Sequence, residues 1–315
     1  MATSSSGGPA PEPIIELACA ARQDYVPHAA AMLHSALTVE RTAAVRIHFL
    51  HGADLPGDDR DRLGEMVAAL GGEIDFHLIS DEDVAGLRTR TFLPASHWYR
   101  IFLPELLPAV DRILYLDGDL IALDSVRPLW ESELGNHYLA AVTNVFQPND
   151  MHRPAQLGLP PDQPYFNSGV MLMNLELMRR DDRTRALVDY AGEHAERLSW
   201  PEQDALNLVL GDRRLHLHPR WNLMNSILLF PWAADELGAD AVAEARRDPA
   251  IRHFEGPSVN KPWHYLCDRE GRELYLEHRR RTPWPEVVLE GRTPRNVIRR
   301  AARRLRPRAG AAAGP

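Results

Sequence analysis

The stretch RILYLDGDLIAL, residues 112–123, contains two apolar, strand-like runs that are interrupted by Asp117-Gly118-Asp119. An Asp-Gly pair between apolar runs predicts a tight hairpin turn, but a hairpin leaves Asp119 unexplained, because the return strand would begin with a charge. In open α/β sheets, ligands bind beyond the carboxyl ends of the strands, where this strand would place both acids. Hard oxygen ligands suit Mg²⁺ or Mn²⁺. We therefore interpret the two aspartates as metal ligands and keep the plain turn as the alternative.

Strand-like and helical segments alternate upstream of this stretch. Short β-type runs occupy residues 14–20, 44–50 and 73–79, and residues 27–40 and 58–70 between them carry apolar side chains at helical spacing. Strands that alternate with helices at this interval form βαβ units. The sequence therefore predicts an α/β fold with a mainly parallel sheet and helices on its faces.

The rest of the chain is less regular. Residues 97–107 have the pattern of a helix that Pro104 breaks late. The remaining predicted elements are strands at 138–144, 166–174 and 215–219, a helical region at 175–197 and a short helix after Pro201. We expect the N-terminal 125 residues or so to be the regular α/β half of the protein.

The composition is that of an ordinary soluble globular protein. The chain has 315 residues, of which 44% are hydrophobic and 25% charged, and its formal net charge of −8 argues against a general nucleic-acid-binding surface. Cys19 and Cys267 are the only cysteines, which excludes a disulfide framework and a thiolate zinc cluster and favours a reducing compartment. No apolar run reaches the roughly 20 residues that span a bilayer. We expect a cytoplasmic protein.

Both ends of the chain differ from its body. Residues 1–13 are small, polar and proline-containing, lack the features of a signal peptide, and predict a disordered tail. Residues 291–315 contain eight arginines and no acidic residue. A basic amphipathic helix would be formed there by Arg299, Arg300, Arg303 and Arg304 with Val297, Ile298 and Leu305. This C-terminal tail is a candidate for peripheral contact with an anionic membrane at its inner face, and a solvated tail is the alternative.

Three later stretches combine residue types that active sites use. FNSGVMLMNL (166–175) places amide and hydroxyl groups beside a glycine, which permits close backbone approach. WPEQDALN (200–207) gathers two acids and an amide at a helix start. HFEGPSVNKPW (253–263) combines a histidine and a glycine with Lys261, the only lysine in a chain with 36 basic residues. Each stretch alone has a structural explanation, such as acids that complement a helix dipole.

In this order, the Asp117-Gly118-Asp119 motif and the three stretches resemble family 8 of the retaining glycosyltransferases, the group of bacterial lipopolysaccharide galactosyl- and glucosyltransferases and of glycogenin. The resemblance covers roughly residues 14–265, and RIFLPELLPAVDRILYLDGDLIAL (100–123) is especially close to the family pattern. It implies a single GT-A, Rossmann-like domain over residues 14–290. A nucleotide-binding half would span about 14–125, and a sugar- and acceptor-binding half about 126–290.

The resemblance also implies an activity and its site. The reaction would move galactose or glucose from a UDP-sugar to a hydroxyl of a glycan, lipid-linked or small-molecule acceptor, with Mn²⁺ or Mg²⁺ as cofactor. Asp117, Asp119 and His253 match the metal ligands, and Gln203 and Asp204 match the polar pair beneath the reacting anomeric carbon. The positions that match donor-binding residues are Asp24, Tyr25, Arg100, Asp117, Gly118, Asp119, Asn144, Asn167, Ser168, Glu202, Gln203, Gly256 and Lys261.

Two segments depart from the family pattern. ARQDY (21–25) has Arg22 and Gln23 where acids are usual, and four residues rather than two separate Gly256 from Lys261. The second departure changes the register of the segment that would close over the diphosphate.

Retention in glycosidases uses a carboxylate nucleophile, whereas the matching residue here is Gln203. Because an amide is a poor nucleophile, we favour front-face attack by the acceptor hydroxyl within an ion pair. Asp204 is the alternative nucleophile.

Other interpretations compete with this one. Haloacid-dehalogenase-type phosphohydrolases also place a DxD after an apolar strand, but they usually carry Thr or Val two residues after the second Asp, where this chain has Ile121. A nucleotide-sugar-binding protein without catalytic activity is a third interpretation. His216 and His218 share one strand face, yet no third ligand lies near them in the sequence, so we expect them to be structural.

Overall fold

The structure is a computed structural model that describes residues 14–40, 44–89 and 94–305. The predicted disordered tail at residues 1–13 lies outside these ranges, as do residues 306–315 of the predicted basic tail. Within the described residues, no helix has the length and apolar character needed to cross a membrane.

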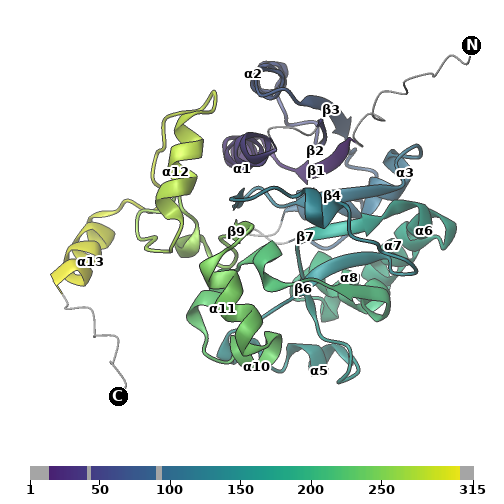
Figure 1. Ribbon diagram of the computed structural model, residues 1–315. Helices are drawn as coiled ribbons and strands as arrows, with labels where there is room; N and C mark the ends of the chain where they lie inside the picture. The colour runs from purple at the N-terminus through teal and green to yellow at the C-terminus, as the bar shows by residue number, and fades with distance from the viewer. Residues whose placement is uncertain (1–13, 41–43, 90–93, 306–315) are drawn as a thin grey trace, which may run out of the picture.

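A seven-stranded sheet in the order β3-β2-β1-β4-β7-β6-β8 forms the centre of the molecule (Figure 1). Its strands are β1 Ile15–Ala20, β2 Val45–His51, β3 Glu73–Leu78, β4 Arg112–Leu116, β6 Leu139–Thr143, β7 Phe166–Asn174 and β8 Arg214–His216. Neighbouring strands are parallel except at β7, which is antiparallel to both β4 and β6. The predicted mixed, mainly parallel sheet is confirmed.

Helices cover both faces of this sheet, and this burial explains the apolar run at residues 113–116 of β4. Leu114 and Leu116 pack with α1 and α2, whereas Ile113 and Tyr115 pack with helices on the opposite face. A strand that is buried on both faces reads as a continuous apolar run. The helices are α1 Val26–Val39, α2 Gly57–Ala69, α3 Leu103–Leu106, α4 Arg127–Trp130, α5 Arg153–Leu157, α6 Leu175–Arg180, α7 Arg183–Glu193, α8 Pro201–Leu210, α9 Asn225–Leu229, α10 Ala233–Leu237, α11 Ala239–Arg247, α12 Arg272–Arg280 and α13 Pro294–Leu305.

The continuous helix predicted over residues 97–107 is wrong. This region consists of two 3₁₀ turns, Ala95–His97 and Tyr99–Phe102, followed by the single turn α3. Pro104 lies in the first turn of α3, not near the end of a long helix. Its missing N–H and its ring prevent the preceding turn from continuing as an α-helix, while a first-turn position tolerates both.

The hairpin interpretation of Asp117-Gly118-Asp119 is also wrong, because the two runs that flank the motif do not pair. β5 (Leu120–Ala122) leaves the central sheet and pairs with β9 (Ile251–His253) in a separate two-stranded antiparallel sheet. The register sets Leu120 opposite His253. A segment more than a hundred residues downstream is thereby brought beside the motif.

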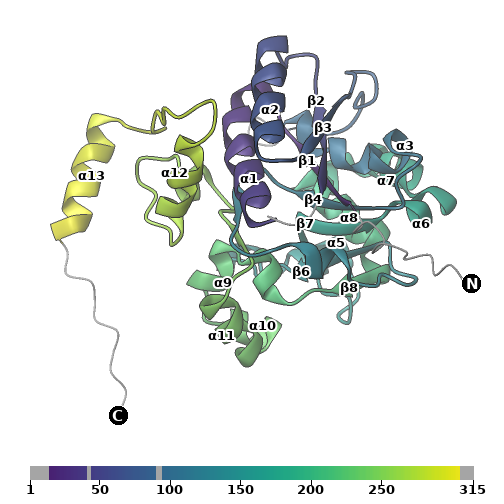
Figure 2. The same cartoon turned by 45° about the horizontal axis from the view of Figure 1, so that its top comes forward.

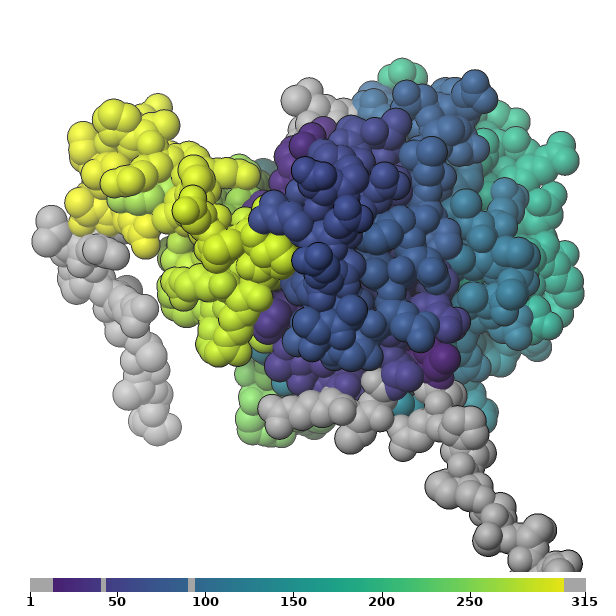
Figure 3. Space-filling view, turned by 90° about the horizontal axis from the view of Figure 1, so that it is seen from above, coloured from purple at the N-terminus to yellow at the C-terminus, as the bar shows by residue number. Residues whose placement is uncertain are grey.

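The C-terminal elements lie on one side of the domain. α12 packs along α1, and α13 lies beyond α12, away from the central sheet (Figures 1 and 2). In the space-filling view these elements form a lobe beside the N-terminal half (Figure 3). The helix predicted near residues 297–305 is therefore present as α13.

Candidate functional site

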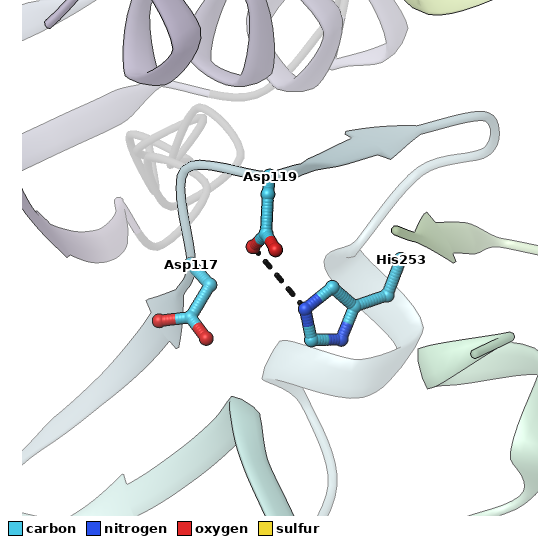
Figure 4. Close-up of side chains that lie close together, drawn as sticks. All are labelled: Asp117, Asp119 and His253. Atoms are coloured by element: carbon cyan, nitrogen blue, oxygen red, sulfur yellow. Dashed lines mark hydrogen bonds and ion pairs between the residues drawn. The ribbon is translucent and has the colours of Figure 1, made fainter. Parts of the chain in front are cut away.

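Three potential metal ligands converge where β4 ends. Asp117 follows β4, Asp119 precedes β5, and His253 ends β9 (Figure 4). The Nε2 atom of His253 lies 3.2 Å from Oδ1 of Asp119, and one ligand atom from each of the three residues lies within 4.8 Å of the others. Asp119 is 6% and His253 2% exposed. Within the described part of the chain, this is the one such cluster of His, Cys, Asp or Glu side chains.

Gly169 allows this convergence. A Cβ atom at position 169 would lie 2.3 Å from Cε1 of His253 and 2.9 Å from Oδ2 of Asp117. Strand β7 therefore approaches the cluster closely enough that hydrogen is the only side chain that fits. Two carboxylates and an imidazole in such a confined site fit a divalent cation that accepts oxygen and nitrogen ligands.

Charges around Asp119 keep its carboxylate ionised. Burial opposes the charged form, but the Lys261 ammonium and the His253 ring outweigh burial and hold the pKa of Asp119 far below its usual range. Lys261 Nζ is paired with Oδ2 of Asp119 and also donates to the carbonyl of Phe254 at 3.1 Å. For His253, burial lowers the pKa, and the nearby Asp119 carboxylate more than offsets it, so the pKa is raised. The Asp119 carboxylate is thus deprotonated and available to bind a cation.

Arg100 lies fully buried between two acids that face the same cleft. Its Nη2 donates to Oδ1 of Asp117 at 2.8 Å, and its Nε lies 3.3 Å from Oε1 of Glu202. The guanidinium also packs 4.2 Å over the ring of Tyr115. Burial raises the pKa of Glu202 to about 7, against the opposing effect of Arg100. Glu202 can therefore carry or release a proton near neutral pH.

Gln203 reaches the cleft, whereas Asp204 lies beneath it. Oε1 of Gln203 accepts from the backbone N–H of Ser168 at 3.0 Å and from its hydroxyl at 3.2 Å. Asp204 is 0% exposed; its carboxylate accepts from the Tyr165 hydroxyl at 2.7 Å and pairs with Arg153. Because these donors occupy the Asp204 carboxylate, the geometry gives no support to its role as the alternative nucleophile.

A cavity of about 900 Å³ joins these groups. It is lined by every residue that the sequence assigned to the donor or the metal, and Asp204 is the one predicted site residue that does not line it. The aromatic ring of Tyr25 lies against Gly118, where a Cβ atom would be 3.1 Å from the ring. The unusual spacing between Gly256 and Lys261 does not move the lysine out of the site, because its ammonium reaches Asp119.

Sequence reasoning missed several residues that shape the site. Gly169 was noted in the FNSG stretch only as a glycine that permits close backbone approach, and its contacts with His253 and Asp117 were not predicted. Tyr165 and Asn222 lie behind Gln203 and His253 respectively, and no local pattern marks either residue. We expected His216 and His218 to be structural. His216 contacts Arg214, His218 accepts from the backbone N–H of Arg220, and neither histidine lines the cavity.

Comparison with known proteins identifies the family. The sequence model described as glycosyl transferase family 8 matches residues 16–267. The chain belongs to this family. It is therefore a glycosyltransferase, and the phosphohydrolase interpretation is wrong.

Two relatives and one solved structure show how far the similarity extends. General stress protein A of Bacillus subtilis (strain 168) is 28% identical over 280 residues, 87% of this chain and 96% of that protein. The lipopolysaccharide glucosyltransferase WaaO of Escherichia coli (strain K12) is 22% identical over 254 residues, 79% of this chain and 73% of that protein. The galactosyltransferase LgtC, solved with donor and acceptor sugar analogues, superposes with a TM-score of 0.76 at 26% identity, over 85% of this chain and 96% of LgtC. The predicted GT-A fold is confirmed.

Substitution of Gly169 tests whether the three ligands must approach as closely as they do. In Gly169→Ala the new methyl group should push His253 and Asp117 apart, so Mn²⁺ affinity should fall by about 10-fold or more. Gly169 has no positive φ, so its backbone accepts alanine and the protein should still unfold cooperatively. Isothermal titration with Mn²⁺ and thermal unfolding would measure both effects.

Gly192→Ala is the matched control. Gly192 is an exposed residue of α7 with no atom within 4 Å of an added Cβ. This variant should bind Mn²⁺ as the wild-type protein does. Unchanged Mn²⁺ affinity in Gly169→Ala would contradict the assignment of the metal site.

Proposed function

We propose that this glycosyltransferase moves galactose or glucose from a UDP-sugar to an acceptor hydroxyl, with retention of the anomeric configuration and with Mn²⁺ or Mg²⁺ as cofactor. The observation that carries the proposal is the convergence of Asp117, Asp119 and His253 inside the cleft of a family 8 member. The names of WaaO and LgtC, which specify glucosyl and galactosyl transfer, support a hexose as the transferred group.

The cluster and Lys261 would act on the diphosphate of the donor. A divalent cation bound by the two aspartates and His253 would supply Lewis-acid neutralisation of the charge that develops on the leaving group. Lys261 lies beside Asp119 and adds a compact positive charge at the same place. Preorganised charges of this kind stabilise a leaving group without having to reorganise during the reaction.

The sugar would lie between Arg100, Asn167 and Gln203, which line the inner part of the cleft. The Gln203 carbonyl oxygen is held by Ser168, so the amide is rigid. A rigid amide oxygen can stabilise positive charge at the anomeric carbon without forming a bond to it. The geometry thus fits front-face attack better than a covalent intermediate on Asp204, because that carboxylate is buried and paired.

Tyr25 and Asp24 would bind the nucleoside at the outer part of the cleft. Tyr25 is held edge-on to Trp263, with ring centroids 5.4 Å apart, and offers an aromatic surface to a base. Glu202 and Ser168 would bind sugar hydroxyls together with Asn144. Gly256 has a φ of 93°, which permits the turn that carries the chain over the cleft toward Lys261.

We further propose that the acceptor is a glycan, a lipid-linked glycan or a small molecule, and that α13 brings the enzyme to the inner face of a membrane with anionic lipids. Ile298 is 71% exposed and Val297 42%, on a helix whose charged residues are all arginine. Arg300 holds α13 against Tyr265: its guanidinium donates to the Tyr265 carbonyl at 2.7 Å and packs over the Tyr265 ring. An amphipathic, basic helix at the edge of the molecule is suited to bind an anionic membrane surface.

Removal of the metal should abolish transfer. Hydrolysis of each nucleotide sugar, followed with and without Mn²⁺, should show UDP-sugar cleavage that stops with chelator and returns with Mn²⁺. Asp119→Asn should lose about 10³-fold in turnover if metal assistance contributes about 4 kcal/mol. Asp61→Asn, an exposed aspartate of α2, is the control and should keep wild-type turnover. Full activity in chelator would contradict the proposed metal dependence.

Activity should require the compact ammonium of Lys261 and not merely a positive charge at this position. Lys261→Arg should be impaired, because a broad planar guanidinium would not reproduce the contacts of the compact ammonium with both Asp119 and the Phe254 carbonyl. Lys261→Ala should be impaired further, and both variants should weaken UDP binding as well as turnover, since the phosphate contact exists before and during departure. Steady-state kinetics and UDP titration would measure this. Wild-type values for both variants would show that another residue contacts the diphosphate.

Membrane contact should depend on the tail. Removal of residues 291–315 should weaken binding to vesicles that contain anionic lipid while donor hydrolysis is retained, and added salt should weaken the binding of the full-length protein. Vesicle co-sedimentation at several salt concentrations, with neutral vesicles as the control, would measure it. Equal binding of the truncated and full-length proteins to anionic vesicles would argue against membrane docking.

A further inference from the structure

A buried row of hydrogen bonds lies behind the metal-ligand cluster. The Nδ1 atom of His253, on the side of the ring away from Asp119, is 2.9 Å from Oδ1 of Asn222. Nδ2 of Asn222 is 2.9 Å from Oδ1 of Asn167, a residue that lines the cleft. Asn222 is 0% exposed and does not line the cavity. It connects the cluster to the sugar side of the cleft through its amide alone.

The direction of this row is set by a backbone group. The N–H of Gly169 can only donate, and it lies 3.1 Å from Oδ1 of Asn167, so that atom is the carbonyl oxygen. Asn222 must therefore present its amino group to Asn167 and its carbonyl oxygen to His253. Because a carbonyl oxygen can only accept, Nδ1 of His253 carries the hydrogen. The ring nitrogen that faces Asp119 is Nε2, 3.2 Å from Oδ1 (Figure 4). It donates to the carboxylate when the ring carries both protons, and it holds the lone pair when the ring is neutral.

The backbone around Asn222 is ordered by the same strand that supplies His253. Residue 223 pairs with β9: its N–H donates to the carbonyl of Ile251 at 2.8 Å, and its carbonyl accepts from the N–H of His253 at 3.0 Å. Asn222 ends a 3₁₀ turn, Pro219–Asn222, directly before this pairing. The amide and the imidazole are thus held in register by backbone hydrogen bonds, independently of their own contact.

We propose that Asn222 is a positioning residue that holds His253 as the Nδ1–H tautomer, with Nε2 free to bind a divalent cation, and that it couples this ligand to the orientation of Asn167. The coupling extends further, since Nδ2 of Asn167 lies 3.3 Å from Oε1 of Gln203 and 3.4 Å from Oδ1 of Asn144. The metal side and the sugar side of the cleft are therefore oriented by one continuous set of amides. The part of this inference that concerns the metal rests on the proposed function.

Metal binding by purified full-length protein, without donor, tests the role of Asn222. Asn222→Ala removes the acceptor for Nδ1–H and should weaken Mn²⁺ binding by about 10- to 100-fold, the usual effect of losing such a partner. Asn222→Asp keeps an acceptor oxygen toward His253 and should bind Mn²⁺ far more tightly than Asn222→Ala. Its second oxygen would face Oδ1 of Asn167, so the affinity for the UDP-sugar should fall although the metal is bound. The measurements are Mn²⁺ titration by electron paramagnetic resonance and donor titration by calorimetry.

Asn174→Ala is the control for loss of one side-chain hydrogen bond. Asn174 accepts from the N–H of Leu177 at the start of α6, at the opposite end of β7. It should bind Mn²⁺ as the wild-type protein does. Wild-type Mn²⁺ affinity in Asn222→Ala, or equal weakening by Asn222→Ala and Asn222→Asp, would overturn the proposal.

A second readout needs no metal. In metal-free protein with ¹⁵N-labelled histidine, held at a pH at which the ring is neutral, the ring signals of His253, assigned by their loss in His253→Gln, should show the Nδ1–H tautomer in the wild type. The Nε2–H tautomer would overturn the inferred row of hydrogen bonds. If the wild-type protein bound no Mn²⁺, the proposed metal dependence and the role of Asn222 toward a metal would both fail. If the wild-type protein bound Mn²⁺ and Asn222→Ala bound it equally tightly, the role of Asn222 would fail and the proposed metal dependence would stand.

Discussion

The pairing of β5 with β9 is the constraint on which the site depends. Directly after Asp119 the chain leaves the central sheet, and Leu120 pairs with His253, 134 residues after Asp119. This short antiparallel sheet brings His253 to Asp117 and Asp119 and so completes a cluster of three potential metal ligands. The same pairing continues through residue 223, which hydrogen-bonds to β9 and carries Asn222 to the far side of the imidazole. Loss of the β5–β9 register would therefore separate His253 from Asp119 and from Asn222 at once.

The acids at the inner end of the cleft are in direct contact with two cations, the buried Arg100 and the partly buried Lys261. Arg100 bridges Asp117 and Glu202, and Lys261 pairs with Asp119, so each carboxylate at the inner end of the cleft has a positive partner. Buried charges are tolerated only when they are paired and hydrogen-bonded. The arrangement keeps Asp119 ionised while burial raises the pKa of Glu202 to about 7, so two carboxyl groups in one cleft behave differently near neutral pH.

Close packing links these electrostatic features to the sheet. Strand β7, which is antiparallel to both of its neighbours, delivers Asn167 and Ser168 to the cleft and places Gly169 against His253 and Asp117. Gly169 leaves room for His253 and Asp117, while its backbone N–H sets the orientation of Asn167. Gly169 thus sets both how closely His253 and Asp117 approach and how the amide of Asn167 is oriented.

Sequence alone predicted the fold class and the order and position of most strands, because these depend on local apolar periodicity, and through motifs such as Asp117-Gly118-Asp119 it predicted residues that the fold brings to one cleft. It failed over residues 97–107, where helical periodicity hid the effect of Pro104 on the preceding turn. Tertiary structure alone decided that β5 pairs with β9, that Asp204 is buried beneath Gln203, and that Asn222 lies behind His253. Each of these depends on contacts between distant segments, and the direction of a buried hydrogen bond is defined only when all of its partners are in place.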